Sequence, residues 1–314
     1  MDPSTSVVVT ARTEEAAGVI ALDLRRPDGS RLPDWRPGAH IDLVLPNGLT
    51  RQYSLCGDPW DAFSYRVAVA REERGTGGSR YLHDVVRPGA VLGLGGPRNL
   101  FPLVPSPSYR FVAGGVGITP ILPMLRQAEQ QGAQWQLLYL GRYRERMAFL
   151  EDLQPYVDRV EVHVSTESGP ADVAAWLGGL DSRSKVYACG PERLLATVEA
   201  ATSSMPSGWV RMERYTNQRA AVASAPGPFR VAIASTGMSI EVGEEESVAT
   251  ALRRAGQLVL TSCSRGVCGT CEVGVTQGVP DHRDAILDDA ERAANTCMFP
   301  CVSRALSDRL VLDL

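Results

Sequence analysis

This 314-residue chain has no long hydrophobic run, no excess of basic residues and only four histidines. It has no run of about 18 apolar residues, so we expect no transmembrane helix and no membrane partner. Because 32 Lys and Arg face 36 Asp and Glu, the net charge of −4 argues against nucleic acid as a partner. The four histidines, His40, His83, His163 and His282, are scattered, and no Ser–His–Asp set or carboxylate pair indicates hydrolysis. The start, MDPSTSVVVTART, has no signal-peptide pattern, so we expect the cytoplasm.

Cysteine is the residue type with the most uneven distribution. Five of the seven cysteines lie in the last 52 residues. Disulfides are rare in the cytoplasm, so this concentration indicates metal or redox chemistry. Residues 226–314 also hold 12 acidic and eight basic residues, whereas the rest of the chain is balanced. That acidic balance would attract a basic protein partner, or it reflects only a solvated surface.

Three segments differ in their pattern and predict three domains. Residues 1–104 contain short apolar runs between turns, which predict an antiparallel β-barrel, with a helix starting near Ser79 as N-cap. Residues 105–225 alternate strands and helices, including a mostly helical stretch over 146–157, and predict an α/β parallel sheet. Residues 226–314 predict a compact unit of strands with one helix that ends at Gly256. The small, polar segment 217–228 predicts a linker.

Two glycine turns follow strands of the middle segment, AGGVGITP (113–120) and CGP (189–191). Such turns let backbone N–H groups approach a pyrophosphate, and in a parallel sheet both turns lie on the rim that binds ligands. The candidate nucleotide-binding residues are Gly115, Gly117, Thr119, Cys189, Gly190 and Pro191. A tight turn without a ligand and a core role for the cysteine are the alternatives. Together the turns resemble the NAD(P)-binding domain of the ferredoxin-NADP reductase superfamily, in which this cysteine lies near the nicotinamide.

The same superfamily places a flavin-binding barrel ahead of the nucleotide domain, marked by an R-x-Y-[ST] stretch. RQYS supplies Arg51, Tyr53 and Ser54 here. The resemblance assigns the guanidinium to a flavin phosphate, the phenol ring to the isoalloxazine and the hydroxyl to the neighbourhood of the flavin N5. An edge strand with a solvated arginine is the alternative.

Further flavin contacts are implied by the resemblance. A second phosphate loop is expected at Gly77, Gly78 and Ser79, at a helix N-terminus. Backbone groups around Ala68 would face the flavin, and Tyr215 would place an aromatic ring near it. A flexible loop, and a tyrosine buried against the linker, are the alternatives.

Cys263, Cys268 and Cys271 follow the C-x₄-C-x₂-C spacing of plant-type [2Fe–2S] proteins. Glycines in this loop would let backbone N–H groups approach the sulfur atoms. A zinc site built from two knuckles is the alternative, because CMFPC (297–301) follows. The fourth thiolate would then be Cys297 or Cys301.

Over its whole length the chain resembles the phthalate dioxygenase reductase family, which includes vanillate O-demethylase reductases. RQYSLCGDP, AGGVGITP, CGPERLL, CSRGVCGTCEVGV, GVPDHRDAIL and CVSRALSDRLVLDL carry the likeness. In that family CVSRA begins at a cluster ligand, so the resemblance favours Cys301 over Cys297. It also implies FMN, a C-terminal α+β (β-grasp) ferredoxin domain with a [2Fe–2S] cluster, and NADH. Arg142, Arg144 and Arg146 follow a strand and leave NADPH open, with a solvated basic helix start as the alternative.

The resemblance implies the reductase component of a multicomponent oxygenase. Hydride would pass from NADH to FMN beside Ser54 and Cys189, and single electrons would pass through the cluster to a terminal oxygenase docked near the ferredoxin domain. A Rieske-type oxygenase is the preferred partner, and a cytochrome P450 or other haem oxygenase is an alternative. A zinc-stabilised binding module is the non-enzymatic alternative. We expect a monomer.

Overall fold

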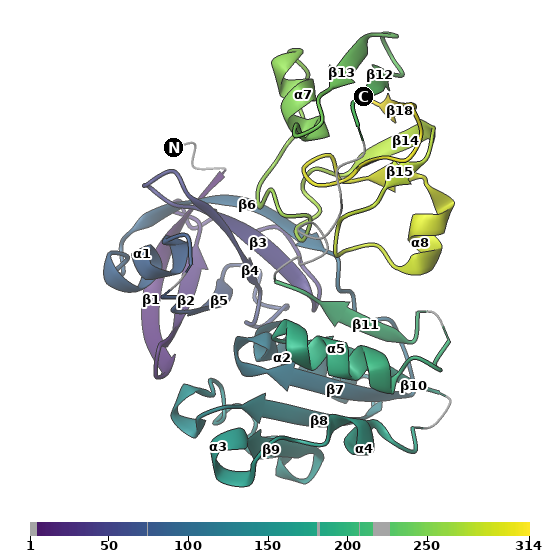
Figure 1. Cartoon of the computed structure of the whole chain (residues 1–314). Helices are drawn as coiled ribbons and strands as arrows, with labels where there is room; N and C mark the ends of the chain where they lie inside the picture. Colours follow the sequence, from purple (N-terminus) through teal and green to yellow (C-terminus); the bar gives the residue numbers. More distant parts are fainter. Residues whose placement is uncertain (1–4, 74, 181–182, 207, 216–226) are drawn as a thin grey trace. The chain divides into compact units, whose positions relative to one another are not determined.

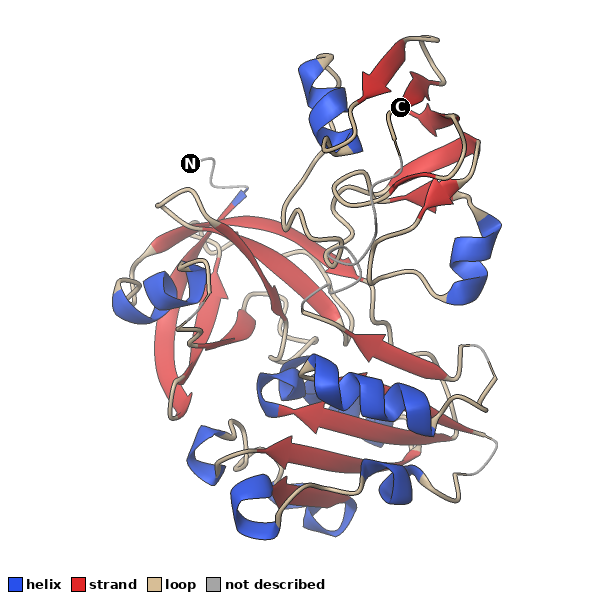
Figure 2. Cartoon of the chain, in the orientation of Figure 1, coloured by secondary structure: helices blue, strands red, loops and turns tan. Residues whose placement is uncertain are grey.

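The computed structural model describes residues 5–73, 75–180, 183–206, 208–215 and 227–314 (Figure 1). Contacts between residues divide the chain into an N-terminal unit, Met1–Glu213, and a C-terminal unit, Arg214–Leu314. The N-terminal unit contains two sheets and the C-terminal unit contains a third, with a short two-stranded ladder beside it (Figure 2). Among the described residues, no helix combines the length and apolar character needed to cross a membrane. Of the predicted linker, only Gly227 and Pro228 lie within the described residues.

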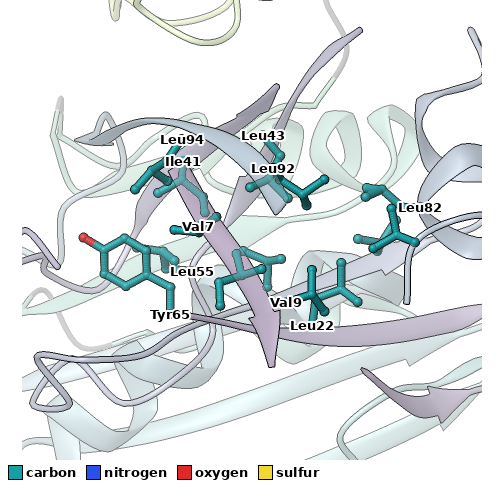
Figure 3. Packing of buried hydrophobic residues seen from close by; sticks show 14 of the residues in the cluster. Val7, Val9, Leu22, Ile41, Leu43, Leu55, Tyr65, Leu82, Leu92 and Leu94 are labelled. Carbon is teal, nitrogen blue, oxygen red and sulfur yellow. The ribbon is translucent and has the colours of Figure 1, made fainter. Parts of the chain in front are cut away.

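The first sheet of the N-terminal unit is antiparallel. Its strands, in the order β4-β3-β6-β1-β2-β5, are β1 (Ser6–Ala16), β2 (Val19–Arg25), β3 (Ala39–Val44), β4 (Thr50–Ser54), β5 (Tyr65–Ala70) and β6 (Val91–Asn99). A bridge between Leu55 and Val67 joins the two edges, so the sheet closes on itself. Val7, Leu22 and Ile41 are among the apolar side chains that fill its interior (Figure 3). This architecture confirms the predicted β-barrel.

The second sheet of the N-terminal unit is parallel throughout. Its strands are β7 (Ser108–Gly114), β8 (Gln134–Gly141), β9 (Val160–Val164), β10 (Ser184–Cys189) and β11 (Val210–Glu213), in the order β11-β10-β7-β8-β9. The helices are α2 (Ile118–Gln130), α3 (Ser165–Ser168), α4 (Val173–Leu177) and α5 (Glu192–Ala201), and Figure 1 shows α5 lying along this sheet. The strand order reverses beside β7, and such a switch point is where open α/β sheets bind ligands. The predicted α/β fold is confirmed.

Two local predictions in the N-terminal unit are wrong. Helix α1 (Gly78–Asp84) has Gly77 as its N-cap, with φ of +90°, so Ser79 lies inside the first turn. Its hydroxyl instead accepts a hydrogen bond from the Glu72 amide at 3.1 Å. The stretch 146–157 forms no α-helix, because Phe149 adopts φ of +62° and the proline at 155 lacks an amide hydrogen. It forms turns and the start of a 3₁₀ helix, η4 (Gln154–Arg159).

Within its described residues, the C-terminal unit is a mixed sheet with two short helices. Its strands run β13-β12-β18-β14-β16, and β15 pairs with β17. The bounds are β12 (Phe229–Ile233), β13 (Ser239–Val242), α7 (Val248–Arg254), β14 (Val273–Gln277), β15 (Pro280–Asp281), α8 (Asp289–Ala294), β16 (Cys297–Met298), β17 (Arg304–Ala305) and β18 (Arg309–Asp313). Helix α7 starts where Ser247 caps the Thr250 amide and is followed by Gly256 at φ of +78°, as the sequence predicts.

Candidate active site and cysteine centre

Three strand ends of the N-terminal unit meet at one carboxylate. Ser54 ends β4, Cys189 ends β10 and Glu213 ends β11. Oε2 of Glu213 accepts a hydrogen bond from the Ser54 hydroxyl at 3.2 Å and one from the Cys189 thiol at 3.6 Å. Both donors are buried, and Cys189 lies opposite Glu213 in the parallel ladder. The two predicted catalytic residues, 135 positions apart in the sequence, therefore share a partner that the sequence analysis did not single out.

The two predicted glycine turns pack against each other without room for side chains. A Cβ on Gly117 would lie 2.2 Å from the carbonyl oxygen of Cys189, and a Cβ on Gly190 would lie 3.0 Å from the Cα of Gly114. Gly115 adopts φ of +55°, in the left-handed region. The contact therefore brings the backbone of both turns to one rim of the sheet, as predicted from the strand ends.

Two further residues of these turns have packing roles. The Thr119 side chain is buried, and its hydroxyl donates to the carbonyl oxygen of Val116 at 2.9 Å. Pro191 is the N-cap of α5, and its ring would lie 2.8 Å from a Cβ on Gly114. Both residues hold the shape of the turns that a nucleotide would meet.

Arg51 lies against the loop that precedes α1. Its Nη2 donates to the carbonyl oxygen of Thr76 at 3.3 Å and to the Thr76 hydroxyl, and its Nη1 donates to the Thr50 carbonyl at 2.6 Å. A Cβ on Gly78 would lie 2.5 Å from the Nε of Arg51, so the loop needs glycine to approach the guanidinium. The predicted phosphate residues Arg51, Gly77 and Gly78 are thus brought together. Thr76 joins them, and its position directly before a double glycine is the signal that would have found it.

The other predicted flavin residues occupy different surroundings. Tyr53 is half-buried against the barrel core, and burial raises the pKa of its phenol, so the hydroxyl stays neutral. Ala68 is buried on β5, where it pairs with Ala21 of β2. Tyr215 is half-buried and belongs to the C-terminal unit.

The predicted cysteine ligands of the C-terminal unit approach each other in two pairs. A hydrogen bond between the side chains of Cys263 and Cys268 lowers the pKa of Cys263 to about 5 and raises that of Cys268. A hydrogen bond between Cys271 and Cys301 likewise lowers the pKa of Cys271 and raises that of Cys301. Cys301 also interacts electrostatically with Cys263. All four predicted ligands therefore belong to one cluster of thiols.

Cys297 lies outside this cluster of thiols. Burial raises the pKa of its thiol, and the charged groups that act on it are the carboxylates of Glu272, Asp284 and Glu291 rather than other cysteines. All seven cysteines are free. Cys301 therefore stays the predicted fourth ligand, as the resemblance implies.

The four thiols have the donor chemistry that a two-iron cluster needs. Each iron of such a cluster takes two protein ligands, and the two thiol pairs supply that number. The Arg265 amide donates to the sulfur of Cys263 at 3.3 Å, and the Val267 and Cys268 amides also lower its pKa. Amide donors stabilise a thiolate, which is the form that binds metal.

The cysteine loop adopts backbone conformations that favour glycine. Gly266 and Gly269 have φ of +68° and +70°, and Ser264 between the first two cysteines has φ of +51°. The Ala285 amide donates to the Gly266 carbonyl at 2.9 Å and ties the loop to the segment before α8. The loop thus turns its amides toward sulfur, as predicted from its glycines.

Comparisons with known proteins cover both units. The family model of the 2Fe-2S iron-sulfur cluster binding domain (Fer2) matches residues 231–306. Phenoxybenzoate dioxygenase subunit beta of Ectopseudomonas oleovorans is 40% identical over 301 residues, which are 95% of this chain and 94% of that protein. The crystal structure of phthalate dioxygenase reductase, described as modular for electron transfer from pyridine nucleotides to [2Fe-2S], is 35% identical with a TM-score of 0.71 and covers 98% and 97% of the two chains.

A third similar structure is an intact type IV self-sufficient cytochrome P450 monooxygenase. It is 36% identical with a TM-score of 0.92, and the match covers 99% of this chain but 41% of that one. The fold, the Fer2 match and the near-complete coverage of the first two relatives agree with one another. The chain belongs to the phthalate dioxygenase reductase family, whose members join a ferredoxin-reductase-like pair of sheets to a C-terminal 2Fe-2S domain.

Proposed function

We propose that the chain is the reductase component of a multicomponent oxygenase, which takes a hydride from NADH onto FMN and delivers electrons singly, through a [2Fe–2S] cluster, to a terminal oxygenase. The observation that carries this proposal is the meeting of Ser54 and Cys189 at Glu213. It joins the end of a barrel strand to the ligand-binding rim of the parallel sheet. The family relationship supports the same activity.

Different residues of the N-terminal unit would bind the dinucleotide and the flavin. The packed turns at Gly115, Gly117 and Gly190 would present backbone amides to the pyrophosphate of the dinucleotide. Cys189 and Ser54 would flank the nicotinamide and the flavin, with Glu213 holding both side chains in place. Glu213 is therefore a positioning residue, because its contacts are with Ser54 and Cys189.

The flavin would be held through its phosphate and its ring. The guanidinium of Arg51, with Thr76 and the backbone at Gly77–Gly78, offers positive charge and donors where a phosphate could bind. Tyr53 offers a neutral aromatic face, and Ala68 and Tyr215 remain proposed flavin contacts. When bound, the flavin accepts two electrons from the nicotinamide and the cluster carries one at a time.

The C-terminal unit would hold the cluster and meet the oxygenase. We propose Cys263, Cys268, Cys271 and Cys301 as ligands. Leu258 and Leu260, a few residues before the first ligand, are 94% and 77% exposed. Large exposed apolar side chains beside a redox loop suit contact with a protein partner, and the acidic balance of residues 226–314 favours a basic surface on it.

Two different relatives support two candidate classes for the oxygenase. A dioxygenase relative supports a Rieske-type partner, which we prefer because that protein covers nearly the same length as this chain. The similarity to a self-sufficient P450 monooxygenase supports a haem partner as the second candidate. Titrating the purified reductase with each class of oxygenase, and measuring product against NADH consumed, distinguishes the two.

The reductase proposal is tested by the visible spectrum of the purified protein. Flavin and [2Fe–2S] bands that bleach on anaerobic addition of NADH are the expected result. A colourless protein with stoichiometric zinc would contradict the proposal and support a binding module. Extracted cofactor should be FMN rather than FAD.

Three broader features belong to the same proposal. The free cysteines fit a reducing compartment, and we propose the cytoplasm. We propose a monomer, checked by light scattering, and domain boundaries at 104/105 and 225/226. Limited proteolysis should cut first near the second boundary and leave a fragment that retains the iron.

A further inference from the structure

An ion pair occupies the rim of the parallel sheet beside the glycine turns. Nε and Nη2 of Arg144 donate to Oε1 and Oε2 of Glu167 at 3.2 and 3.0 Å, so the guanidinium meets the carboxylate through two parallel hydrogen bonds. The bonds raise the pKa of Arg144 and lower the pKa of Glu167, which keeps both groups charged at neutral pH. Both side chains remain about half exposed, so the pair faces solvent and any ligand on this rim.

The ion pair lies where the adenosine end of a dinucleotide would reach. Arg144 follows β8 and Glu167 follows β9, at the same edge at which β7 leads into the glycine turn. Neighbouring strands are about 4.8 Å apart, so these loops begin within about 5 to 10 Å of the pyrophosphate turn. In such sheets the residues after the second strand contact the 2′ position of the ribose.

Glu167 is held at this rim by the backbone around it. The Thr166 hydroxyl and amide donate to the carbonyl oxygen of Arg142 at 2.6 and 3.3 Å, which ties the turn after β9 to the end of β8. Arg142 and Arg146 lie 5.2 and 5.8 Å from the ring centre of Tyr143. Within the described ranges, Arg142 and Arg146 form no ion pair. Of the three arginines in this segment, Arg144 is therefore the one that pairs with a carboxylate.

We propose that Glu167 is a specificity-determining residue that disfavours NADPH, because it engages Arg144 and adds a negative charge where a 2′-phosphate would bind. The inference rests on the proposed function and extends it to the choice of coenzyme. A 2′-phosphate would have to displace the carboxylate from Arg144 and would still be repelled by it. A free 2′-hydroxyl carries no charge and meets neither obstacle.

The test compares two nucleotide probes that differ in the 2′-phosphate. Calorimetric titration measures the affinity of the holoprotein for adenosine 2′,5′-bisphosphate and for adenosine 5′-monophosphate at low ionic strength. Glu167→Gln should bind the bisphosphate about 5- to 10-fold more tightly, with a gain that shrinks as salt is added. The monophosphate affinity should stay within about twofold, and the NADPH-to-NADH ratio of kcat/KM with a dye acceptor should rise by a similar factor.

Two further variants make the test specific. Arg144→Gln combined with Glu167→Gln should lose most of the gain, because the guanidinium that the substitution releases is then absent. Asp84→Asn removes one of the two carboxylates that pair with Arg71 in the N-terminal barrel, and should leave the ratio of probe affinities unchanged.

Unchanged bisphosphate affinity in Glu167→Gln, or an equal gain for both probes, would overturn the inference while the NADH-dependent activity still stands. If wild type and variants bind neither nucleotide and NADH reduces nothing, the proposed function fails, and the inference fails with it.

Discussion

The two candidate centres of this chain are assembled in opposite ways. In the C-terminal unit, three of the four proposed ligands lie within nine consecutive residues of one loop, and Cys301 completes the set. In the N-terminal unit, Ser54, Cys189 and Glu213 come from three strands that are far apart in the sequence. A centre on one loop depends on local backbone conformation, whereas a centre built on strand ends depends on the packing of whole sheets.

This difference decides which substitutions each centre tolerates. The cysteine loop needs particular atoms at particular positions, so exchanging one sulfur should remove its chemistry and spare the fold. The strand-end site needs close contact between turns, so adding a methyl group should disturb the fold itself.

The largest expected effect would be confined to the cysteine centre and would spare the strand-end site. Cys301→Ser should lose the iron and the reduction of one-electron protein acceptors, because oxygen is a poor substitute for a thiolate ligand. NADH-dependent reduction of a small dye should remain, since the N-terminal site is intact. Iron analysis and the two assays measure this. Cys297→Ser is the matched control and should keep the cluster; loss of iron there instead would reassign the fourth ligand.

Gly117→Ala should instead damage the N-terminal unit. The new methyl would lie 2.2 Å from the carbonyl oxygen of Cys189, so the turns must separate. We expect a loss of about 1 to 3 kcal/mol in the free energy of unfolding, read from thermal or denaturant melts. Gly227→Ala meets no atom within 4 Å and serves as the control. An unchanged melt for Gly117→Ala would show that the turns do not depend on this contact.

Glu213→Gln tests whether the strand-end site works as a unit. Losing the charge weakens the hydrogen bonds from Ser54 and Cys189, and we expect about a tenfold slower reduction of the flavin by NADH in stopped flow. Ser54→Ala should cost a similar factor, and the double variant should cost less than the product of the two. Independent, multiplicative effects would mean that the shared carboxylate does not couple the two side chains.

The smallest expected effect concerns acid stability in each unit. In the N-terminal unit, hydrogen bonds from Arg159 and Trp135 lower the pKa of Glu129. A carboxyl group whose pKa is lower in the folded state stabilises the fold at pH values above its unfolded pKa of about 4.5. That contribution is lost as the pH falls through the lower pKa of the folded state. Glu129→Gln should therefore cost about 0.2 to 1 kcal/mol at neutral pH, and progressively less as the pH falls below about 4.5.

Its counterpart in the C-terminal unit is Glu246, whose pKa is lowered by a hydrogen bond from Arg254. Denaturant melts followed separately by flavin and cluster absorbance should show Glu129→Gln in the first signal and Glu246→Gln in the second. A shift of both signals by either variant would mean that the units unfold together.

Much of the fold could be predicted because its signals are local. The glycine turns, the strand and helix alternation and the cysteine spacing each lie within a short stretch of sequence. The capping box of α8, in which Asp288 and Glu291 cap each other's amides, was also readable from D-x-x-E but was missed. Strand β6 was harder to predict from the sequence, since its glycines have low strand propensity. It forms a strand because it pairs with β3 and β1 on either side.

The candidate site was predicted in its parts but not in its centre. Ser54 and Cys189 belong to recognisable motifs, whereas Glu213 is the last residue of a four-residue strand and resembles any charged residue at a strand end. Its role arises from register, because Cys189 pairs with it across the ladder. Register between strands far apart in sequence depends on long-range packing, which a single sequence does not display. The helix predicted over 146–157 failed for the related reason that Phe149 adopts a turn conformation.

Strand β11 has a mechanical consequence. It is an edge strand of four residues, hydrogen-bonded only to β10, and the boundary between the units falls directly after its last residue, Glu213. Tension on the connection between the units would therefore act first on the strand that carries the shared carboxylate. A pull that frays this strand by its last residue would loosen the hydrogen bonds of Ser54 and Cys189 to Glu213 together.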